Sequence, residues 1–174
     1  MTSVDRPSSA TFVPADFDLV DHHGNRVTNA TYHGKHVLVF FGFTHCQVVC
    51  PRALSKLSGV LDTLGPQAAR ITGLYVTVDP DRDTPEIMKA FLTEHYPRFT
   101  GLTGTSDQID AAKKAFRVFA KRAADPDDPE GYVVPHSAIT YVLDPSGTFL
   151  THFTDAVEAD EMASRLQALL AESA

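Results

Sequence analysis

The feature that most constrains the fold is an uninterrupted apolar run that ends in a pair of cysteines. Residues 37–43 read Val-Leu-Val-Phe-Phe-Gly-Phe, and Cys46 and Cys50 follow, with Pro51 closing the motif. An apolar run of this length is typical of a central strand buried on both faces, whereas the apolar residues after the second cysteine recur at helical spacing. We therefore expect a strand that leads into a helix, with a Cys-x-x-x-Cys motif at the junction.

The start of a helix favours thiolate chemistry. Backbone N–H groups there have no intrahelical partner, and the helix dipole stabilises negative charge. We therefore expect Cys46 to have a lowered thiol pKa, which makes it more nucleophilic and a better ligand for a soft metal. Because Cys46 and Cys50 are four positions apart, both can lie on one helical face and share an ion or form a reversible disulfide. Two structural thiols that are neighbours by chance are the plainer alternative, which the position at a strand–helix junction disfavours.

Length and charge limit the classes of protein that the chain can belong to. With 174 residues, 43% of them hydrophobic, it can fill one core and is short for two. The formal net charge of −7, without a basic cluster, excludes nucleic acid and anionic membranes as partners. No stretch approaches the roughly 18 apolar residues of a membrane span. We expect residues 1–11 to be a flexible segment, either a native terminus or the remnant of a membrane tether, and residues 12–174 to form a single domain.

Apolar periodicity and turn signals predict alternating strands and helices. Strands are expected at 17–20, 26–28, 37–43, 71–78, 99–102, 137–143 and 148–153, and helices at 50–64, 84–95, 106–119 and 157–170. Thr84 and Ser106 are the expected helix caps. Residues 121–131 have loop composition. The order of elements predicts an α/β fold, with an N-terminal β-hairpin and a central mixed sheet covered by helices on both faces.

Three blocks of residues resemble the Sco/SenC family of copper chaperones. They are Phe-Gly-Phe-Thr-His-Cys-x-x-x-Cys-Pro at 41–51, Val-Asp-Pro-Asp-Arg-Asp-Thr-Pro-Glu at 78–86, and His-Ser-Ala-Ile-Thr-Tyr-Val-Leu-Asp-Pro-Ser-Gly at 136–147. Their order and spacing match the family over residues 12–172. The resemblance implies a thioredoxin-like fold related to the peroxiredoxins, and a role in assembling the copper site of cytochrome c oxidase.

The resemblance also implies a ligand set, namely Cys46, Cys50 and His136. Copper(I) is soft and prefers thiolates, and imidazole suits both Cu(I) and Cu(II), so these residues form a chemically sensible copper site. Zinc would fit the same ligands. His136 is chosen from the matching block alone, because a lone histidine at a strand start is otherwise read as structural.

From the resemblance we expect a copper-binding chaperone that delivers copper to the CuA site of cytochrome c oxidase subunit II. The alternative is a thiol–disulfide oxidoreductase, in which Cys46 attacks a partner disulfide and Cys50 resolves it. A peroxidase-like enzyme is a weaker third reading. Another copper chaperone or a thioredoxin-like reductant would be a further partner, and we expect a monomer. The family implies a location at the periplasmic face of the inner membrane, or an equivalent envelope compartment, behind an N-terminal anchor.

Two positions depart from the family pattern. Family members commonly have Pro-Asp after the first cysteine, where this chain has Gln47 and Val48, and often Asp before the histidine, where it has Pro135. Neither change removes an expected ligand. The loss of an acidic residue between the cysteines would lower the affinity for Cu(II), and it keeps a purely redox role open.

The other histidines are expected to have no direct role as ligands. His22 and His23 fall in a predicted turn and should be exposed to solvent. His45, next to the first cysteine, would lower the pKa of the neighbouring thiol rather than bind metal. The remaining four have no metal-ligand partner at a recognisable spacing; they are His33, His36, His95 and His152.

An acidic segment follows the strand expected at 71–78, so it should lie at the same end of the sheet as the cysteines. We expect Asp79 and Asp83 to cap the next helix and Arg82 to pair with a neighbouring carboxylate. The alternative is that Asp79 orients the metal site. A Pro- and Asp-rich stretch at 124–130 is expected to be a mobile loop that admits the ion or a partner.

Overall fold

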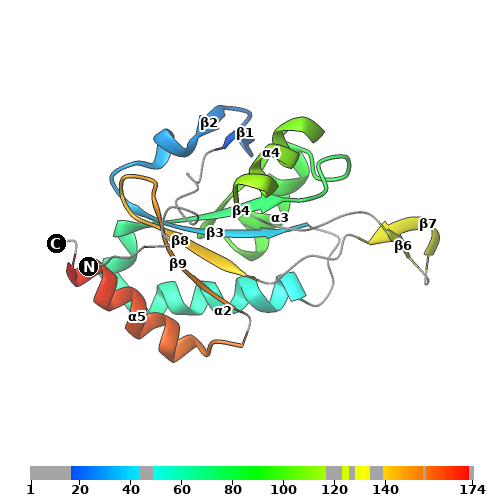
Figure 1. Ribbon diagram of the computed structural model, residues 1–174. Helices are drawn as coiled ribbons and strands as arrows, with labels where there is room; N and C mark the ends of the chain where they lie inside the picture. The colour runs from blue at the N-terminus through cyan, green and yellow to red at the C-terminus, as the bar shows by residue number, and fades with distance from the viewer. Residues whose placement is uncertain are drawn as a thin grey trace, which may run out of the picture.

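A mixed seven-stranded sheet forms the centre of the computed structural model (Figure 1), which describes residues 17–43, 49–116, 123–125, 128–133, 139–154 and 156–172. The strands are β1 (Asp18–Asp21), β2 (Arg26–Thr28), β3 (His36–Gly42), β4 (Ile71–Thr77), β5 (Phe99–Thr103), β8 (Thr140–Leu143) and β9 (Phe149–Phe153). Their order across the sheet is β2-β1-β5-β4-β3-β8-β9. The central strands β3, β4 and β5 are parallel, and β1 and β8 flank them in the antiparallel sense. The predicted α/β fold with an N-terminal hairpin is confirmed.

Helices cover both faces of this sheet. They are α2 (Val49–Leu64), α3 (Pro85–His95), α4 (Ser106–Phe116) and α5 (Ala159–Glu172), with short 3-10 helices η1 (Asn29–Tyr32) and η2 (Gly65–Arg70). Apolar residues of α2, α3 and α5 share one core cluster, whereas α4 packs with the N-terminal hairpin in the other. Figure 1 shows α2 and α5 below the sheet and α4 above it. None of the helices in the described part of the chain is long and apolar enough to cross a bilayer.

Strand β3 is buried on both faces, as its continuous apolar run predicts. Leu38 and Phe40 point into the cluster beneath the sheet, and Val37, Val39 and Phe41 point into the cluster above it. All seven residues of the strand are buried. Because successive side chains of a strand alternate between the two faces, only a run without polar interruptions satisfies both cores.

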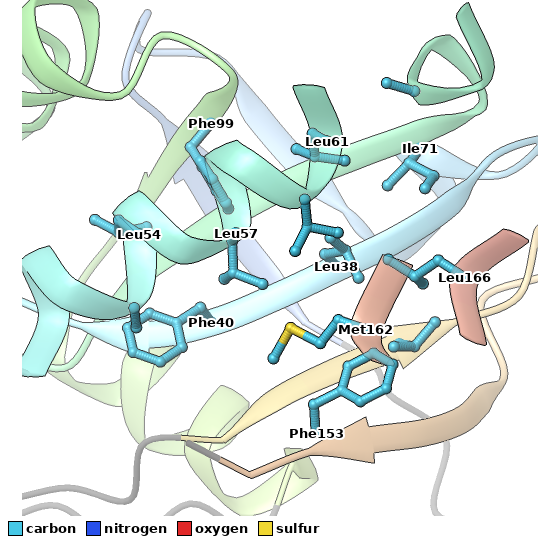
Figure 2. Packing of buried hydrophobic residues seen from close by; sticks show 14 of the residues in the cluster. Leu38, Phe40, Leu54, Leu57, Leu61, Ile71, Phe99, Phe153, Met162 and Leu166 are labelled. Atoms are coloured by element: carbon cyan, nitrogen blue, oxygen red, sulfur yellow. The ribbon is translucent and has the colours of Figure 1, made fainter. Parts of the chain in front are cut away.

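The lower cluster joins α2 to the sheet and to the C-terminal helix (Figure 2). Leu54, Leu57 and Leu61 of α2 recur at helical spacing and lie against β3, and Met162 and Leu166 bring α5 onto the same core. Each of these five side chains is at most 2% exposed. Burying a leucine side chain stabilises a fold by about 1.5–3 kcal/mol. The packing of these leucines therefore holds α2 against β3.

Helix caps follow the sequence prediction at one helix and differ by one residue at another. Thr84 caps α3, because its side-chain oxygen accepts a hydrogen bond from Ile87 N. At α4 the cap is Thr105 rather than the expected Ser106. The Thr105 hydroxyl accepts from Gln108 N at 3.1 Å, while Gln108 Oε1 accepts from Thr105 N at 2.9 Å. This reciprocal pair is a capping box, which satisfies two backbone donors and therefore favours threonine over its neighbour.

The loop expected at 121–131 is wrong for the residues that the structure describes, whereas the mobility expected at 124–130 stays a prediction. Strands β6 (Ala123–Asp125) and β7 (Asp128–Val133) pair in the antiparallel sense as a separate two-stranded sheet. Figure 1 shows this hairpin extending away from the central sheet, on the side where α2 begins. Proline and aspartate give the segment its loop composition, but its register is carried by Ala123 opposite Val133 and Ala124 opposite Tyr132.

The turn between β8 and β9 forms around Asp144, as predicted. Its Oδ1 accepts hydrogen bonds from the Ser146 N and Thr148 N groups, both at 2.9 Å, and from Ser146 Oγ at 2.7 Å. Burial alone would raise the pKa of Asp144, but these hydrogen bonds from Ser146 and Thr148 lower it below its ordinary value. Gly147 closes the turn at a φ of 87°, which glycine adopts without strain.

Candidate metal and thiol site

The described parts of three motif-bearing segments lie at one edge of the sheet, the edge at which α2 begins. In the parallel pair, Gly42 at the end of β3 lies opposite Thr77 at the end of β4, and Val78 N donates to Gly42 O at 2.8 Å. On the other side of β3, Phe40 pairs with Thr140, the first residue of the antiparallel strand β8. The ends of β3 and β4 and the start of β8 therefore lie at the same edge of the sheet (Figure 1). The shared position of the cysteine helix and the acidic segment is confirmed.

Most of the expected ligand set falls outside the described residues. Cys46 and His136 lie outside them, and Cys50 is described only as the second residue of α2, without its side chain. Cys46 follows Gly42 by four residues and His136 precedes Thr140 by four. The ligand set stays a prediction.

The start of α2 gives Cys50 a definite backbone setting. Because the helix begins at Val49, Cys50 stands in its first turn, where backbone N–H groups lack intrahelical partners. These groups and the positive end of the helix dipole stabilise anions such as a thiolate. The packing of α2 on the core holds this helix end at the edge where β3 stops. The backbone at this edge therefore suits the chemistry expected of the cysteines.

Buried polar residues follow β4 at the same edge. Asp79 is 1% exposed and Asp83 is fully buried, which is unusual for carboxylates. The Thr77 hydroxyl donates to Asp83 Oδ2 at 2.7 Å and accepts from Asp79 N at 2.9 Å. From the neighbouring strand, the Thr103 hydroxyl donates to Asp83 O at 2.8 Å. Hydrogen bonds thus tie the 79–83 turn to the ends of two strands.

These contacts correct one prediction and confirm another. The expectation that the two aspartates cap α3 is wrong, because Thr84 is the cap and Asp83 instead accepts the Thr77 hydroxyl. The expected pairing of Arg82 with a carboxylate is confirmed, since its Nε donates to Asp79 Oδ2 at 2.5 Å. Aspartate is common before a helix, so the sequence favours capping. The hydrogen bond from the Thr77 hydroxyl to the Asp83 carboxylate cannot be read from the sequence.

Arg82 connects the turn after β4 with the end of β3. Its guanidinium carbon lies 6.0 Å from the ring centroid of Phe43, the last described residue before the cysteine motif. Phe43 is buried. Sequence reasoning did not single out this contact, although a signal existed, since both residues directly follow neighbouring apolar strands.

The histidines differ in part from their predicted settings. His23 is exposed, as predicted, but His22 is half-buried, because its Nδ1 accepts a hydrogen bond from Gly101 N at 3.0 Å. Burial, and next the nearby charge of His23, lower the pKa of His22. His36 is buried at the start of β3, and burial followed by the charge of Arg70 lowers its pKa as well.

The described residues include neither the histidine beside the first cysteine nor a cluster of metal ligands. His45 lies outside the described residues, so its tuning role stays a prediction. Within the part of the chain that the structure describes, no three His, Cys, Asp or Glu residues lie close enough together to hold a metal ion.

A mixed sheet with three parallel central strands, a helix that follows one of them, β3, and a cysteine motif in the chain between the two define a thioredoxin-like protein. Residues 5–171 match the model of the SCO1/SenC family, and the chain belongs to this family. An SCO2-like protein of Rickettsia felis is 36% identical over 141 residues, which are 81% of this chain and 69% of that protein.

Solved structures of the same family have the same fold. ScoI of Arabidopsis thaliana with copper bound has a TM-score of 0.82 and 28% identity, and the match covers 88% of this chain and 95% of that one. ScoI of Bradyrhizobium japonicum, also with copper bound, has a TM-score of 0.80 and 36% identity, covering 88% and 96% of the two chains.

Proposed function

We propose that this protein binds copper through Cys46, Cys50 and His136 and delivers it to the CuA site of cytochrome c oxidase subunit II. The observation that supports the proposal is that β3 and β4 end, and β8 begins, at one edge of the sheet. Two Sco structures that match this chain over 88% of its length hold copper, which supports copper as the metal. Sco-family proteins bind copper and take part in cytochrome c oxidase assembly.

Two thiolates and an imidazole suit a copper ion that is bound and then transferred to a partner. Two thiolates hold soft Cu(I), and an imidazole adds a ligand that both oxidation states accept. Binding requires deprotonated thiols, so each cysteine that becomes a ligand releases its proton. The start of α2 places unpaired backbone N–H groups and the positive end of the helix dipole beside the cysteine motif. Copper would then pass to thiolates of the partner by stepwise ligand exchange, without breaking a bond in a substrate.

Location and partners follow from the same proposal. Subunit II would be the acceptor, with another copper chaperone or a thioredoxin-like reductant as a further partner. An envelope compartment such as the periplasmic face of the inner membrane suits that role. The human relative, which is 36% identical over 152 residues, is described as mitochondrial, and this chain spans 50% of its length.

A second candidate function is reduction of the oxidase cysteines. Gln47 and Val48 stand where family members commonly have Pro-Asp, so the chain lacks a carboxylate between its cysteines. Cys46 would attack a partner disulfide and form a mixed disulfide, which Cys50 would resolve as the pair becomes oxidised. An external reductant would have to regenerate the two thiols.

Anaerobic titration of the reduced protein tests the copper site. We expect one Cu(I) per chain, and loss of tight binding in Cys46→Ser and Cys50→Ser. His136→Ala should weaken Cu(II) more than Cu(I), because two thiolates can still hold the softer ion. His23→Ala is the matched control, since His23 is exposed. Unchanged Cu(II) binding and an unchanged spectrum in His136→Ala would refute the ligand set.

Complementation of a deletion strain at low copper separates the two functions. Under the copper proposal, His136→Ala should fail to restore oxidase activity, and added copper should largely rescue it. Under the reductase alternative, His136→Ala should restore activity and only the two cysteine variants should fail. Restoration of oxidase activity at low copper by His136→Ala would therefore replace the copper proposal with the reductase.

A further inference from the structure

The pair formed by Asp79 and Arg82 is an ion pair whose carboxylate is removed from water. The Asp79 side chain has no exposed surface, and the Arg82 side chain is 22% exposed. Burying a carboxylate is unfavourable unless a charge or hydrogen bonds compensate it. A turn at the protein surface could form without a buried carboxylate, so the buried pair calls for an explanation. Helix capping does not explain the pair, because Thr84 caps α3.

The ion pair connects the turn after β4 with the end of β3. Asp79 fixes Arg82 through the bond between Oδ2 and Nε. The guanidinium carbon of Arg82 in turn lies 6.0 Å from the ring centroid of Phe43. A cation above an aromatic ring is attracted by the negative face of the ring, more strongly where water is excluded. Phe43 is buried and comes three residues before Cys46 in the sequence.

The backbone of Asp79 is also held by a hydrogen bond. Its backbone N–H donates to the Thr77 hydroxyl, which in turn donates to the buried Asp83 carboxylate. The pair therefore rests on the last residue of β4, whose partner across the ladder is Gly42, next to Phe43. Contacts therefore run from Thr77 at the end of β4, through Asp79 and Arg82, to Phe43 just after β3.

We propose that Arg82, held by Asp79, is a positioning residue for the first cysteine, because it fixes Phe43 at the end of β3. The inference deepens the proposed function and rests on it for the role of Cys46. Arg82 does not bind the metal; it limits the positions that the segment after Phe43 can take. Partners beyond the direct ligands commonly change metal affinity by about 10–100-fold.

The test compares Arg82→Met with Arg98→Met. Methionine keeps most of the length of the side chain and removes the charge. Arg98 forms an exposed pair with Asp62 at 2.7 Å and serves as the matched control. We expect the affinity for Cu(I), measured by competition with a chromophoric chelator, to fall about tenfold in Arg82→Met and to stay unchanged in Arg98→Met. Phe43→Leu, which leaves the ion pair in place, should lower the affinity in the same direction.

A readout without copper separates this inference from the proposed function. Hydrogen–deuterium exchange of a peptide that covers residues 43–48 should be faster in Arg82→Met than in the wild type or in Arg98→Met. If the wild type binds no copper, the proposed function fails, and the exchange result alone supports or overturns the positioning role. A folded Arg82→Met with unchanged exchange at 43–48 overturns it.

A folding defect would not leave the question open. Arg82→Met leaves Asp79 charged and buried, so the single variant can fail to fold for that reason alone. Combining Arg82→Met with Asp79→Asn removes both charges, and this double variant should fold. We expect it to show the weaker copper affinity and the faster exchange of Arg82→Met. Wild-type copper affinity and exchange in the folded double variant would overturn the proposal.

Discussion

Two arginine–aspartate pairs in this protein have the same chemistry and opposite surroundings. At the site edge, Arg82 and Asp79 have side chains that are 22% and 0% exposed. On the N-terminal hairpin, Arg26 and Asp18 form a pair at 2.7 Å, with side chains that are 75% and 46% exposed. Water competes for the second pair and screens it, whereas the first pair is held by its surroundings in one geometry.

The comparison shows that distance alone does not rank ion pairs. The hydrogen bond from Arg26 lowers the pKa of Asp18, so the exposed contact is real, yet exposed pairs contribute little to stability. The buried pair is different because its carboxylate is fully buried and cannot exchange the arginine for water. An exposed pair can therefore be lost without consequence, while the buried one determines how two strand ends are arranged.

The largest expected effect comes from breaking the buried pair. Asp79→Ala should lower the free energy of unfolding by about 3 kcal/mol, because it removes a buried carboxylate that accepts a hydrogen bond from Arg82. Asp18→Ala, the same substitution in the exposed pair, should leave the free energy of unfolding indistinguishable from that of the wild type. Urea denaturation monitored by circular dichroism measures both. Equal losses in the two variants would refute the distinction drawn here.

A smaller effect is expected from the hydroxyl that supports the pair. Thr77→Val removes the donor to Asp83 Oδ2 and the acceptor of Asp79 N, both in buried surroundings. A buried polar group without its partner destabilises by about 1–3 kcal/mol, and we expect a loss in that range. The control is Thr63→Val, since the Thr63 hydroxyl donates to Gly59 O on an exposed helix face. A Thr77→Val variant as stable as Thr63→Val would show that the network does not depend on this hydroxyl.

The smallest effect concerns the hairpin and appears only as a pH dependence. His22 accepts the Gly101 N–H through Nδ1, and its pKa is lowered from the ordinary value of 6.5 by burial and by His23. The unfolded chain therefore binds the proton more readily, and stability is lost as the pH falls below 6.5 through the folded pKa. His22→Asn keeps an acceptor that does not titrate, so its stability should fall less steeply over that range.

Urea denaturation at a series of pH values measures this effect. His152→Asn, a change of an exposed histidine, is the control. Part of the loss should persist in His22→Asn, because the pKa of buried His36 is also lowered. Identical pH profiles for His22→Asn and the wild type would mean that the ring of His22 does not hold the hairpin to β5.

Elements of the fold that depend on periodicity could be predicted from the sequence. The apolar run at 37–43 could only be a strand buried on both faces, and the leucines of α2 could only form one helical face. The hairpin β6–β7 could not be predicted, because its prolines and aspartates have the composition of a loop. The half-burial of His22 was equally hidden, since it depends on Gly101, which is distant in the sequence.

Prediction of the site divides in the same way. Connectivity and strand order predict that the residues after β3 and after β4 share an edge, and the structure confirms it. The burial of Asp79 and the contact of Arg82 with Phe43 depend on side-chain packing across two strands, which no local pattern encodes. The choice of His136 came from the family resemblance alone, because nothing around one histidine in a chain specifies a ligand.

The position of β3 between β4 and β8 also has a consequence for folding kinetics. Phe40 must find Thr140, one hundred residues further along the chain, whereas β8 and β9 close locally around the Asp144 turn. Pairings between distant segments form slowly, because the closure entropy of a long loop must be overcome first. Until β8 arrives, one side of an apolar strand is left open, and open strand edges associate between molecules. The yield of refolding should therefore fall as the protein concentration rises.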